Sequence, residues 1–219
     1  MLKKFILTAG SLLLMTSSAD AADADTLKLE LSSGGTVTIE MLPDRAPAHV
    51  ERIKKLTREG FYDGIVFHRV IDGFMAQTGD PTGTGTGGSN EPDLPAEFTD
   101  YQYKRGTVGM ARTANPNSAN SQFFICFSDD GCSFLTGEYT VWGQVTEGME
   151  FIDAIARTEP ERAPTLDKII KAMVANDAAA NDAAAEAAPA ETAPAEDAGA
   201  TEPAAGDAAD EAGSETPAE

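Results

Sequence analysis

Basic residues are scarce in this chain of 219 residues, which has 16 Lys and Arg against 36 Asp and Glu. A formal net charge of −20 opposes binding to a phosphate backbone, so we expect no nucleic-acid partner. Long apolar runs are also few. The most extended one, residues 5–15, is shorter than the roughly 20 residues that a membrane-spanning helix needs. We therefore expect no stable insertion into a membrane.

Histidine and cysteine, two residue types that bind metals or act as nucleophiles, are sparse, with only two of each. His49 and His68 have no partner at metal-ligand spacing, and the cysteines lack the C-x-x-C pattern. No G-x-S-x-G elbow or Gly-Lys-Ser/Thr motif is present. We expect neither a metal nor a cofactor. We expect His68 to lie on a strand as a structural residue with its hydrogen bonds satisfied.

The glycines of residues 83–88 fit the G-x-G-x-x-G pattern of nucleotide-binding loops. That pattern indicates nucleotide binding only between a strand and a helix, whereas residues 89–92, Ser-Asn-Glu-Pro, are typical of a loop. The segment is interpreted as a glycine-rich loop whose backbone can approach a ligand or the rest of the domain closely.

The N-terminal residues 1–21 have the pattern of a secretory signal peptide. Lys3 and Lys4 precede the apolar run, and Ala19 and Ala21 fit the small-x-small cleavage rule. We expect export with cleavage after Ala21, or after one of the next alanines, Ala22 and Ala24. The alternative is a frayed N-terminal helix or a retained anchor.

The C-terminal residues 176–219 hold twelve Asp and Glu, no Lys or Arg, and no aromatic or large aliphatic residue. Such a segment cannot bury enough apolar surface to offset its ordering entropy, so a disordered tail is expected. It would act as a solvating spacer or, alternatively, as a binding arm for a cationic partner.

The intervening residues 22–175 are long enough for one domain with its own core. Residues 27–31 and 37–41 alternate apolar and polar side chains on either side of a glycine turn, which predicts a β-hairpin. A helix is expected to open at Pro47 and to stop at Gly60.

A second short helix is expected at residues 149–157, and a long irregular loop at residues 81–101. Many short strands and only two helices predict an antiparallel barrel or sandwich. Besides the hairpin, the apolar runs predict strands at residues 65–70, 74–77, 107–111, 122–127, 140–145 and 166–174.

Cys126 and Cys132 leave two alternatives open. In an exported protein the pair can form a disulfide, which would contribute about 2 kcal/mol in the chain-entropy model because the loop is short. Alternatively, Cys126 lies in a predicted buried strand, where a free thiol packs as a small apolar residue.

Two segments carry the most specific pattern: FHRVIDGFMAQTGD at residues 67–80 and GMARTANPNSANSQFFICF at residues 109–127. They resemble the signature segments of the cyclophilin family of peptidyl-prolyl cis-trans isomerases, in its bacterial form. The resemblance covers residues 27–174 and implies a mainly-β fold, an eight-stranded antiparallel β-barrel capped by two α-helices. It also implies proline-containing polypeptides as substrates. Together with the leader, it indicates an exported, periplasmic enzyme, which we expect to act as a monomer.

The resemblance implies that Arg69 is the catalytic residue and that Gln77 holds the substrate and the arginine in place. Other positions are implied to bind the substrate, around the proline ring and in the neighbouring groove. They are Phe74, Met75, Ala111, Arg112, Gln122, Phe124, Phe134, Leu135 and Tyr139. Phe134 stands where the eukaryotic pattern has tryptophan, and Tyr139 where it has histidine. Because phenylalanine lacks the indole donor, tight binding of the inhibitor cyclosporin is not expected.

These residue types suit the isomerisation chemistry. Rotation about a peptide bond is opposed by a barrier of about 18–20 kcal/mol, because the nitrogen lone pair is delocalised. A permanently charged arginine can donate a hydrogen bond to that lone pair in the twisted state. Alternatively, Arg69 could be a surface residue paired with Glu97 or Asp80, and the aromatic residues could be ordinary core. A second functional hypothesis is a cyclophilin-fold binding module or chaperone, in which the acidic tail protects clients and catalysis is incidental.

Overall fold

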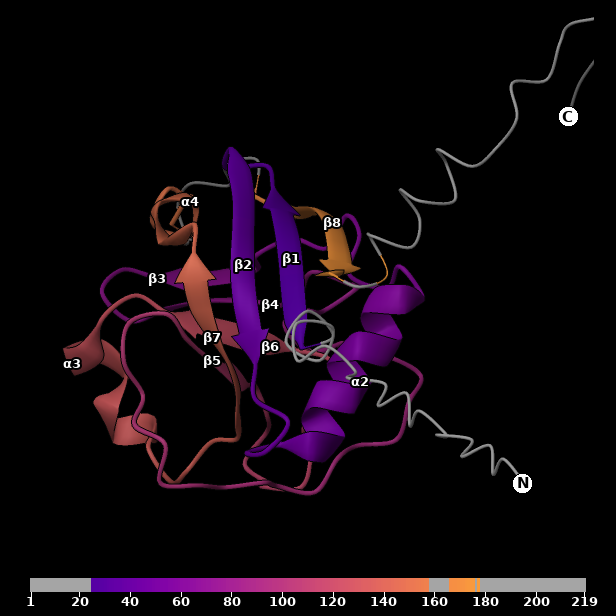
Figure 1. The fold of residues 1–219 in the computed structure, drawn as a ribbon, viewed down its shortest axis with the longest axis vertical. Coiled ribbons are helices and arrows are strands. Elements are labelled where there is room, and N and C mark those ends of the chain that lie inside the picture. Colours follow the sequence, from indigo (N-terminus) through magenta and orange to yellow (C-terminus); the bar gives the residue numbers. More distant parts are fainter. Residues whose placement is uncertain (1–24, 158–165, 176, 178–219) are drawn as a thin grey trace, which may run out of the picture. The chain divides into compact units, whose positions relative to one another are not determined.

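The computed structural model describes residues 25–157, 166–175 and 177, and Figure 1 shows their arrangement. The predicted signal peptide and, apart from Asp177, the predicted tail at residues 176–219 lie outside the described residues. Within the described part of the chain, no helix is both long and apolar enough to cross a membrane.

Eight strands form one antiparallel sheet in the order β3-β4-β6-β5-β7-β2-β1-β8. The mainly-β class and the strand number implied by the resemblance are therefore confirmed. The strands are β1 (Thr26–Leu31), β2 (Gly35–Met41), β3 (Arg69–Ile71), β4 (Met75–Thr78), β5 (Thr107–Met110), β6 (Phe123–Cys126), β7 (Val141–Glu147) and β8 (Ile169–Val174).

The sheet curls, so that β1, β2 and β7 lie roughly vertical in Figure 1 while β3, β4 and β6 cross behind them. The two edge strands approach each other just before they begin. Val66 forms an isolated bridge with Lys168, and the Phe67 backbone N–H donates to the Asp167 carbonyl at 2.8 Å. The curled sheet is thereby joined edge to edge at one end.

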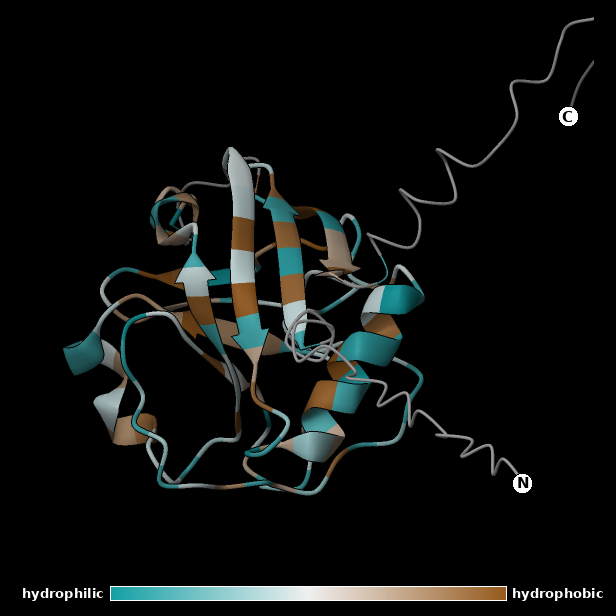
Figure 2. Cartoon of the chain, in the orientation of Figure 1, coloured by the Kyte–Doolittle hydropathy of each residue, from teal (hydrophilic) through white to brown (hydrophobic). Residues whose placement is uncertain are grey.

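The first hairpin, β1 and β2, shows how the sequence alternation builds the core. Leu27, Leu29 and Leu31 are buried, and their neighbours in the strand point outward. Figure 2 shows the resulting alternation of hydrophobic and hydrophilic bands along β1 and β2. One face of each strand therefore lines the interior, as the two-residue period of a half-buried strand requires.

The first helix, α2 (Pro47–Arg58), packs its buried face against β8 and β7. Pro47 suits the first helical position because its missing N–H would have no partner there. The Glu97 carboxylate accepts the backbone N–H groups of Ala48 and His49, both at 3.2 Å, and so caps the N-terminus of the helix from the long loop.

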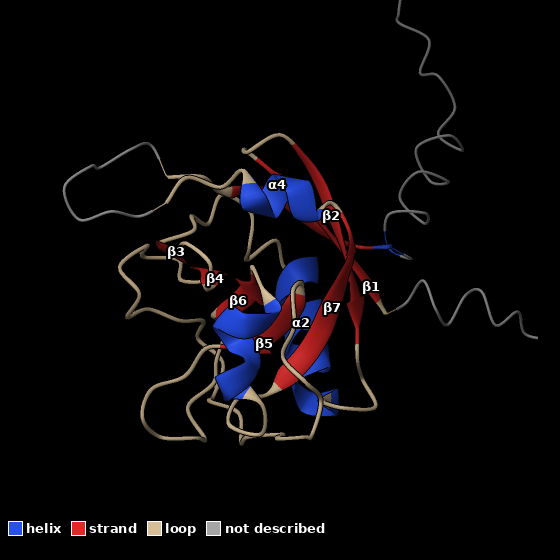
Figure 3. Ribbon diagram, turned by 90° about the vertical axis from the view of Figure 1, so that its left-hand side faces the viewer, coloured by secondary structure: helices blue, strands red, loops and turns tan. Residues whose placement is uncertain are grey.

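The second predicted helix is present but shorter, as α4 (Met149–Asp153), which packs against β2 (Figure 3). Two short elements were not predicted: α3 (Asp129–Cys132) and the single 3-10 turn η1 (Ser133–Leu135). The Ser128 hydroxyl accepts the Gly131 backbone N–H at 3.1 Å and caps α3, a serine signal that the strand-based interpretation overlooked.

Candidate active site

The hairpin of β3 and β4 places the first two predicted site residues side by side. Arg69 is the cross-strand partner of Gln77, and Gln77 is in turn the partner of Phe124 on β6. Because directly opposed residues point to the same face of a sheet, these three side chains lie in a row across β3, β4 and β6. Val70, the next residue of β3, is buried on the other face.

A small hollow of about 120 Å³ opens beside this row. Met75, Phe124 and Leu135 give it an apolar wall, and each of these side chains is at most 5% exposed. Nine of the eleven predicted site residues line the hollow: Arg69, Phe74, Met75, Gln77, Ala111, Arg112, Phe124, Leu135 and Tyr139.

The Arg69 guanidinium sits at the edge of the hollow. Its Nη1 donates to Gln77 Oε1 at 3.4 Å, and its central carbon lies 5.9 Å from the centroid of the Phe74 ring. Among residues 25–157, 166–175 and 177, no carboxylate forms an ion pair with Arg69. Its charge is therefore available to a bound group.

The two acids considered as partners of Arg69 bind elsewhere. Glu97 contacts His49 Nδ1 at 2.6 Å, besides capping α2. Asp80 is only 1% exposed and accepts hydrogen bonds from the loop that follows it. Burial raises the pKa of the Asp80 carboxyl, but the hydrogen bonds that it accepts together hold that pKa well below its usual value.

Arg112 lies between this hollow and a larger one of about 480 Å³. Its guanidinium stacks on the Tyr139 ring at 4.3 Å and donates to the carbonyls of Thr113, at 2.9 Å, and Glu138, at 3.0 Å. The predicted groove residue Gln122 lines the larger hollow, and its amide donates to the carbonyls of Gly85 and Gly87, which line the same hollow.

Phe134 lies at the rim of the small hollow, outside its lining. Its side chain is 67% exposed, and its ring packs on Phe74 with centroids 5.6 Å apart. All eleven predicted residues thus belong to one surface region, although Phe134 and Gln122 occupy its margins.

The two cysteines form a disulfide next to the site. Cys126 on β6 is bonded to Cys132 at the end of α3, with 6.2 Å between their Cα atoms. The alternative of a free, buried thiol does not apply, because neither cysteine is free. η1 begins at the next residue and carries Phe134 and Leu135, so the bridge ties one wall of the hollow to the sheet.

The prediction for His68 is wrong in two respects. β3 begins one residue later, at Arg69. Neither ring nitrogen of His68 has a partner in hydrogen-bond geometry within the described residues, although the Gln122 amide approaches the ring. The imidazole packs beneath Gly85, where an added Cβ would lie 3.4 Å from the ring. Burial lowers the pKa of His68, because it disfavours the charged imidazolium.

The sequence analysis missed two aromatic residues of the site. Tyr103 is buried behind the hollow, where its ring stacks on Phe124 at 5.8 Å, and its hydroxyl donates to the Thr140 carbonyl at 3.3 Å. Phe98, 40% exposed, flanks Arg112. Both belong to stretches without regular structure, so no periodic pattern marks them. Within the described part of the chain, no group of three or more His, Cys, Asp or Glu could hold a metal ion.

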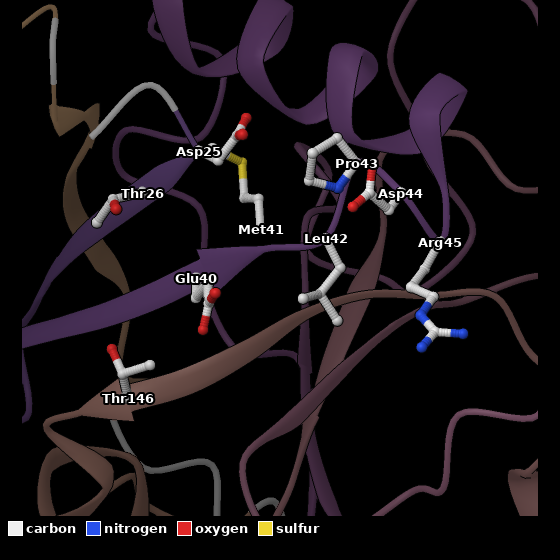
Figure 4. A pocket seen from close by; sticks show the side chains of 9 residues that line it. All are labelled: Asp25, Thr26, Glu40, Met41, Leu42, Pro43, Asp44, Arg45 and Thr146. Carbon is white, nitrogen blue, oxygen red and sulfur yellow. The ribbon is translucent and has the colours of Figure 1, made fainter. Parts of the chain in front are cut away.

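A further hollow of about 460 Å³ lies at the start of β1 and the end of β2 (Figure 4). Two of the charged side chains that line it, Asp25 and Arg45, form ion pairs. Asp25 accepts from Lys54 at 2.7 Å, and Arg45 lies 3.7 Å from Asp100. It contains none of the predicted site residues. The small hollow beside Arg69 is therefore the better candidate for chemistry.

The family model of the cyclophilin type peptidyl-prolyl cis-trans isomerases matches residues 26–174. The chain therefore belongs to the cyclophilin-type peptidyl-prolyl cis-trans isomerases. The matched range covers every strand of the sheet and every residue of the candidate site.

Curated relatives carry the same description. A probable peptidyl-prolyl cis-trans isomerase of Brucella suis is 53% identical over 174 residues, which cover 73% of this chain and 88% of the relative. Peptidyl-prolyl cis-trans isomerase B of Bacillus subtilis is 42% identical over 122 residues, or 55% of this chain and 83% of the relative.

Solved cyclophilins share the fold. The cyclophilin AquaCyp293 of Hirschia baltica aligns with a TM-score of 0.61 at 29% identity, over 71% of this chain and 75% of that protein. A cyclophilin-type isomerase of Cryptosporidium parvum, determined in the presence of the dipeptide Ala-Pro, aligns with a TM-score of 0.62 at 27% identity. That alignment covers 68% of this chain and 98% of the other.

Proposed function

We propose that this chain accelerates rotation about X-Pro bonds in exported polypeptides, with Arg69 as the catalytic residue and Gln77 as its support. One observation carries the proposal. A guanidinium without an ion-pair partner among the described residues sits at the edge of an apolar hollow, within reach of a group bound there.

The mechanism requires no covalent step. In the planar ground state the prolyl nitrogen has no free lone pair, whereas in the twisted state the lone pair becomes localised on that nitrogen. A hydrogen bond from Arg69 to the nitrogen is therefore stronger in the transition state than in either isomer, and this difference lowers the barrier. Arginine remains charged at every relevant pH, so no proton needs to move.

The hollow would hold the proline ring while the preceding carbonyl swings. Its walls from Met75, Phe124 and Leu135 exclude water, which strengthens the hydrogen bond from Arg69. Ala111, Arg112 and Gln122 would bind the neighbouring part of the substrate chain. The determination of the Cryptosporidium parvum relative with an Ala-Pro dipeptide supports a proline-containing substrate here.

The export of the enzyme is the second part of the proposal. It rests on the leader-like residues 1–21, whose charged start, apolar run and small residues suit signal peptidase cleavage. Mass spectrometry of the protein recovered from the periplasm of an expressing bacterium would measure the mature N-terminus. We expect it to follow Ala21, and an intact Met1 would contradict export with cleavage.

The catalytic proposal is tested by Arg69→Ala. A charged hydrogen bond of about 3 kcal/mol in the transition state corresponds to a loss of roughly 100-fold in kcat/KM on an X-Pro peptide. Arg45→Ala is a matched control. The Arg45 guanidinium lies 6.0 Å from the Tyr101 ring, as Arg69 lies near the Phe74 ring, but Arg45 lines the hollow at the start of β1. If Arg69→Ala retained the wild-type rate, the mechanism would be wrong.

A further inference from the structure

The Asp80 carboxylate is buried at the start of a loop formed by residues 82–88, here called the Gly/Thr loop. Its Oδ1 accepts the Thr82 backbone N–H at 2.7 Å and the Thr82 hydroxyl at 2.8 Å. Its Oδ2 accepts the backbone N–H groups of Gly85, at 2.6 Å, and Gly87, at 3.1 Å. A single acid therefore fixes three peptide groups of the loop.

The same two glycines also contact the site, through their carbonyl groups. The Gly85 and Gly87 carbonyls accept from Gln122 Nε2 at 3.1 Å and 2.7 Å. An amide whose NH₂ group faces two carbonyls must turn its oxygen away from them. Gln122 Oε1 accordingly accepts from Gln77 Nε2, at 2.9 Å.

The direction of this chain of hydrogen bonds continues to the catalytic arginine. Because Gln77 Nε2 is bound to Gln122, the Gln77 oxygen is directed to Arg69, whose Nη1 donates to it at 3.4 Å. Reversal of the Gln122 amide would place its oxygen against two carbonyl oxygens. The carbonyls of the Gly/Thr loop therefore determine which end of Gln77 meets the guanidinium.

We propose that Asp80 is a positioning residue for the isomerase reaction, because it holds the Gly/Thr loop carbonyls that orient Gln122, Gln77 and through them Arg69. This inference rests on the proposed function, in which Arg69 is the catalytic residue. Asp80 itself does not line the hollow that contains Arg69.

An aspartate is required at this position because all of its partners are donors. In Asp80→Asn, one of the two oxygens becomes an NH₂ group, which would face backbone N–H or hydroxyl donors. The loop is also packed tightly onto the acid. A Cβ on Gly87 would collide with Asp80 Oδ1 and would lie 2.9 Å from Thr82.

The first test compares Asp80→Asn with Asp63→Asn. Asp63 is a matched control, since its carboxylate also accepts a backbone N–H, from Ala172 at 3.0 Å, but binds β8 instead of the Gly/Thr loop. We expect Asp80→Asn to lower kcat about tenfold with KM within twofold of wild type. We expect Asp63→Asn to change neither constant more than twofold. In ¹⁵N NMR spectra, the side-chain amide signals of Gln77 and Gln122 should move only in Asp80→Asn.

A second variant tests the positioning role even if Asp80→Asn does not fold. Gly87→Ala displaces the loop from the acid and leaves Asp80 unchanged, and we expect a similar loss of kcat with the same amide signals moved. In addition, introducing Asp80→Asn into Arg69→Ala should lower kcat by less than a further twofold, because Asp80 acts through Arg69.

The outcomes separate the two proposals. If Arg69→Ala is fully active, the proposed function fails and this inference fails with it. If Arg69→Ala loses activity but Gly87→Ala and folded Asp80→Asn retain the wild-type kcat, the positioning role alone is overturned. A full tenfold loss on adding Asp80→Asn to Arg69→Ala would also overturn it, since Asp80 would then act independently of the arginine.

Discussion

Arg112 stacks on Tyr139 at 4.3 Å and thereby joins two separate segments of the chain at the candidate site. The guanidinium also donates to the Glu138 carbonyl, so the contact holds the segment after β5 against the segment before β7. Arg112 contributes to both hollows and forms the ridge between them.

This ridge predicts a binding role for the Arg112 side chain. Arg112→Met keeps the length of the side chain but removes the stack and two hydrogen bonds, so we expect KM to rise about fivefold to tenfold and kcat to change little. The KM of Arg112→Lys should lie between the KM of the wild type and that of Arg112→Met, because lysine lacks the planar guanidinium. Steady-state kinetics on an X-Pro peptide measure both constants. A fall in kcat at constant KM would contradict a binding role.

Reduction of the disulfide is expected to loosen the wall that carries Phe134 and Leu135. The bridge joins cysteines six positions apart, and its loss should lower the free energy of unfolding by about 2 kcal/mol in the chain-entropy model. Urea unfolding of the wild type with and without reductant measures this difference. The double variant Cys126→Ala with Cys132→Ala should show the lower stability in both conditions. Equal stability of oxidised and reduced wild type would disprove the contribution.

Two buried imidazoles predict how stability depends on pH. Burial lowers the pKa of both His49 and His68, although the Glu97 carboxylate partly opposes this effect at His49. Below about pH 6.5 the unfolded chain binds protons at these histidines while the folded chain resists them. The contribution of these two histidines to the free energy of unfolding is therefore fully present above that pH and is lost as the solution becomes more acidic.

Urea unfolding at pH 7.5 and pH 5.5 tests this expectation. The free energy of unfolding should be lower at pH 5.5 in the wild type, and the decrease should be smaller in His68→Phe, which cannot be protonated there. An undiminished decrease in His68→Phe would show that this imidazole does not contribute.

Because residue 134 is a phenylalanine, we expect cyclosporin to bind weakly. The variant Phe134→Trp should bind it more tightly. Phe134 is exposed on top of Phe74, where an indole ring has room and its N–H can donate to a ligand. One such hydrogen bond of about 1 kcal/mol, together with the larger ring, would lower Kd roughly tenfold in Phe134→Trp. Calorimetric titration measures this change. Phe134→Leu, which adds no hydrogen-bond donor, is the control and should not strengthen binding.

The strands of this domain could be predicted because their side chains alternate. Leu27 to Leu31 and Val37 to Met41 show the two-residue period, and the hairpin is found where it was expected. The number of strands and their order could not be derived in this way. β3 and β4 have only 3 and 4 residues, too few for a period to be distinguished from chance.

The candidate site was predictable as a set of residues, because two contiguous segments supply most of it. Its supporting contacts were not. Asp80 acts through backbone groups of a loop without regular structure, and Tyr103 reaches Phe124 from such a loop. A carboxylate followed by alternating threonine and glycine is nevertheless a local signal, because such an acid can accept the N–H groups of the turn that follows.

The pairing of β1 with β8 determines when the molecule can finish folding. The chain is synthesised from its N-terminus, so Thr26–Leu31 is the first strand of the sheet to emerge, whereas its partner Ile169–Val174 is the last strand of the sheet to emerge. Until then one edge of β1 has exposed backbone groups and could pair with other chains. A sheet built in this way is complete only after almost all of the domain has been synthesised, and a ribosome that stalls before residue 169 would release the chain with an open edge.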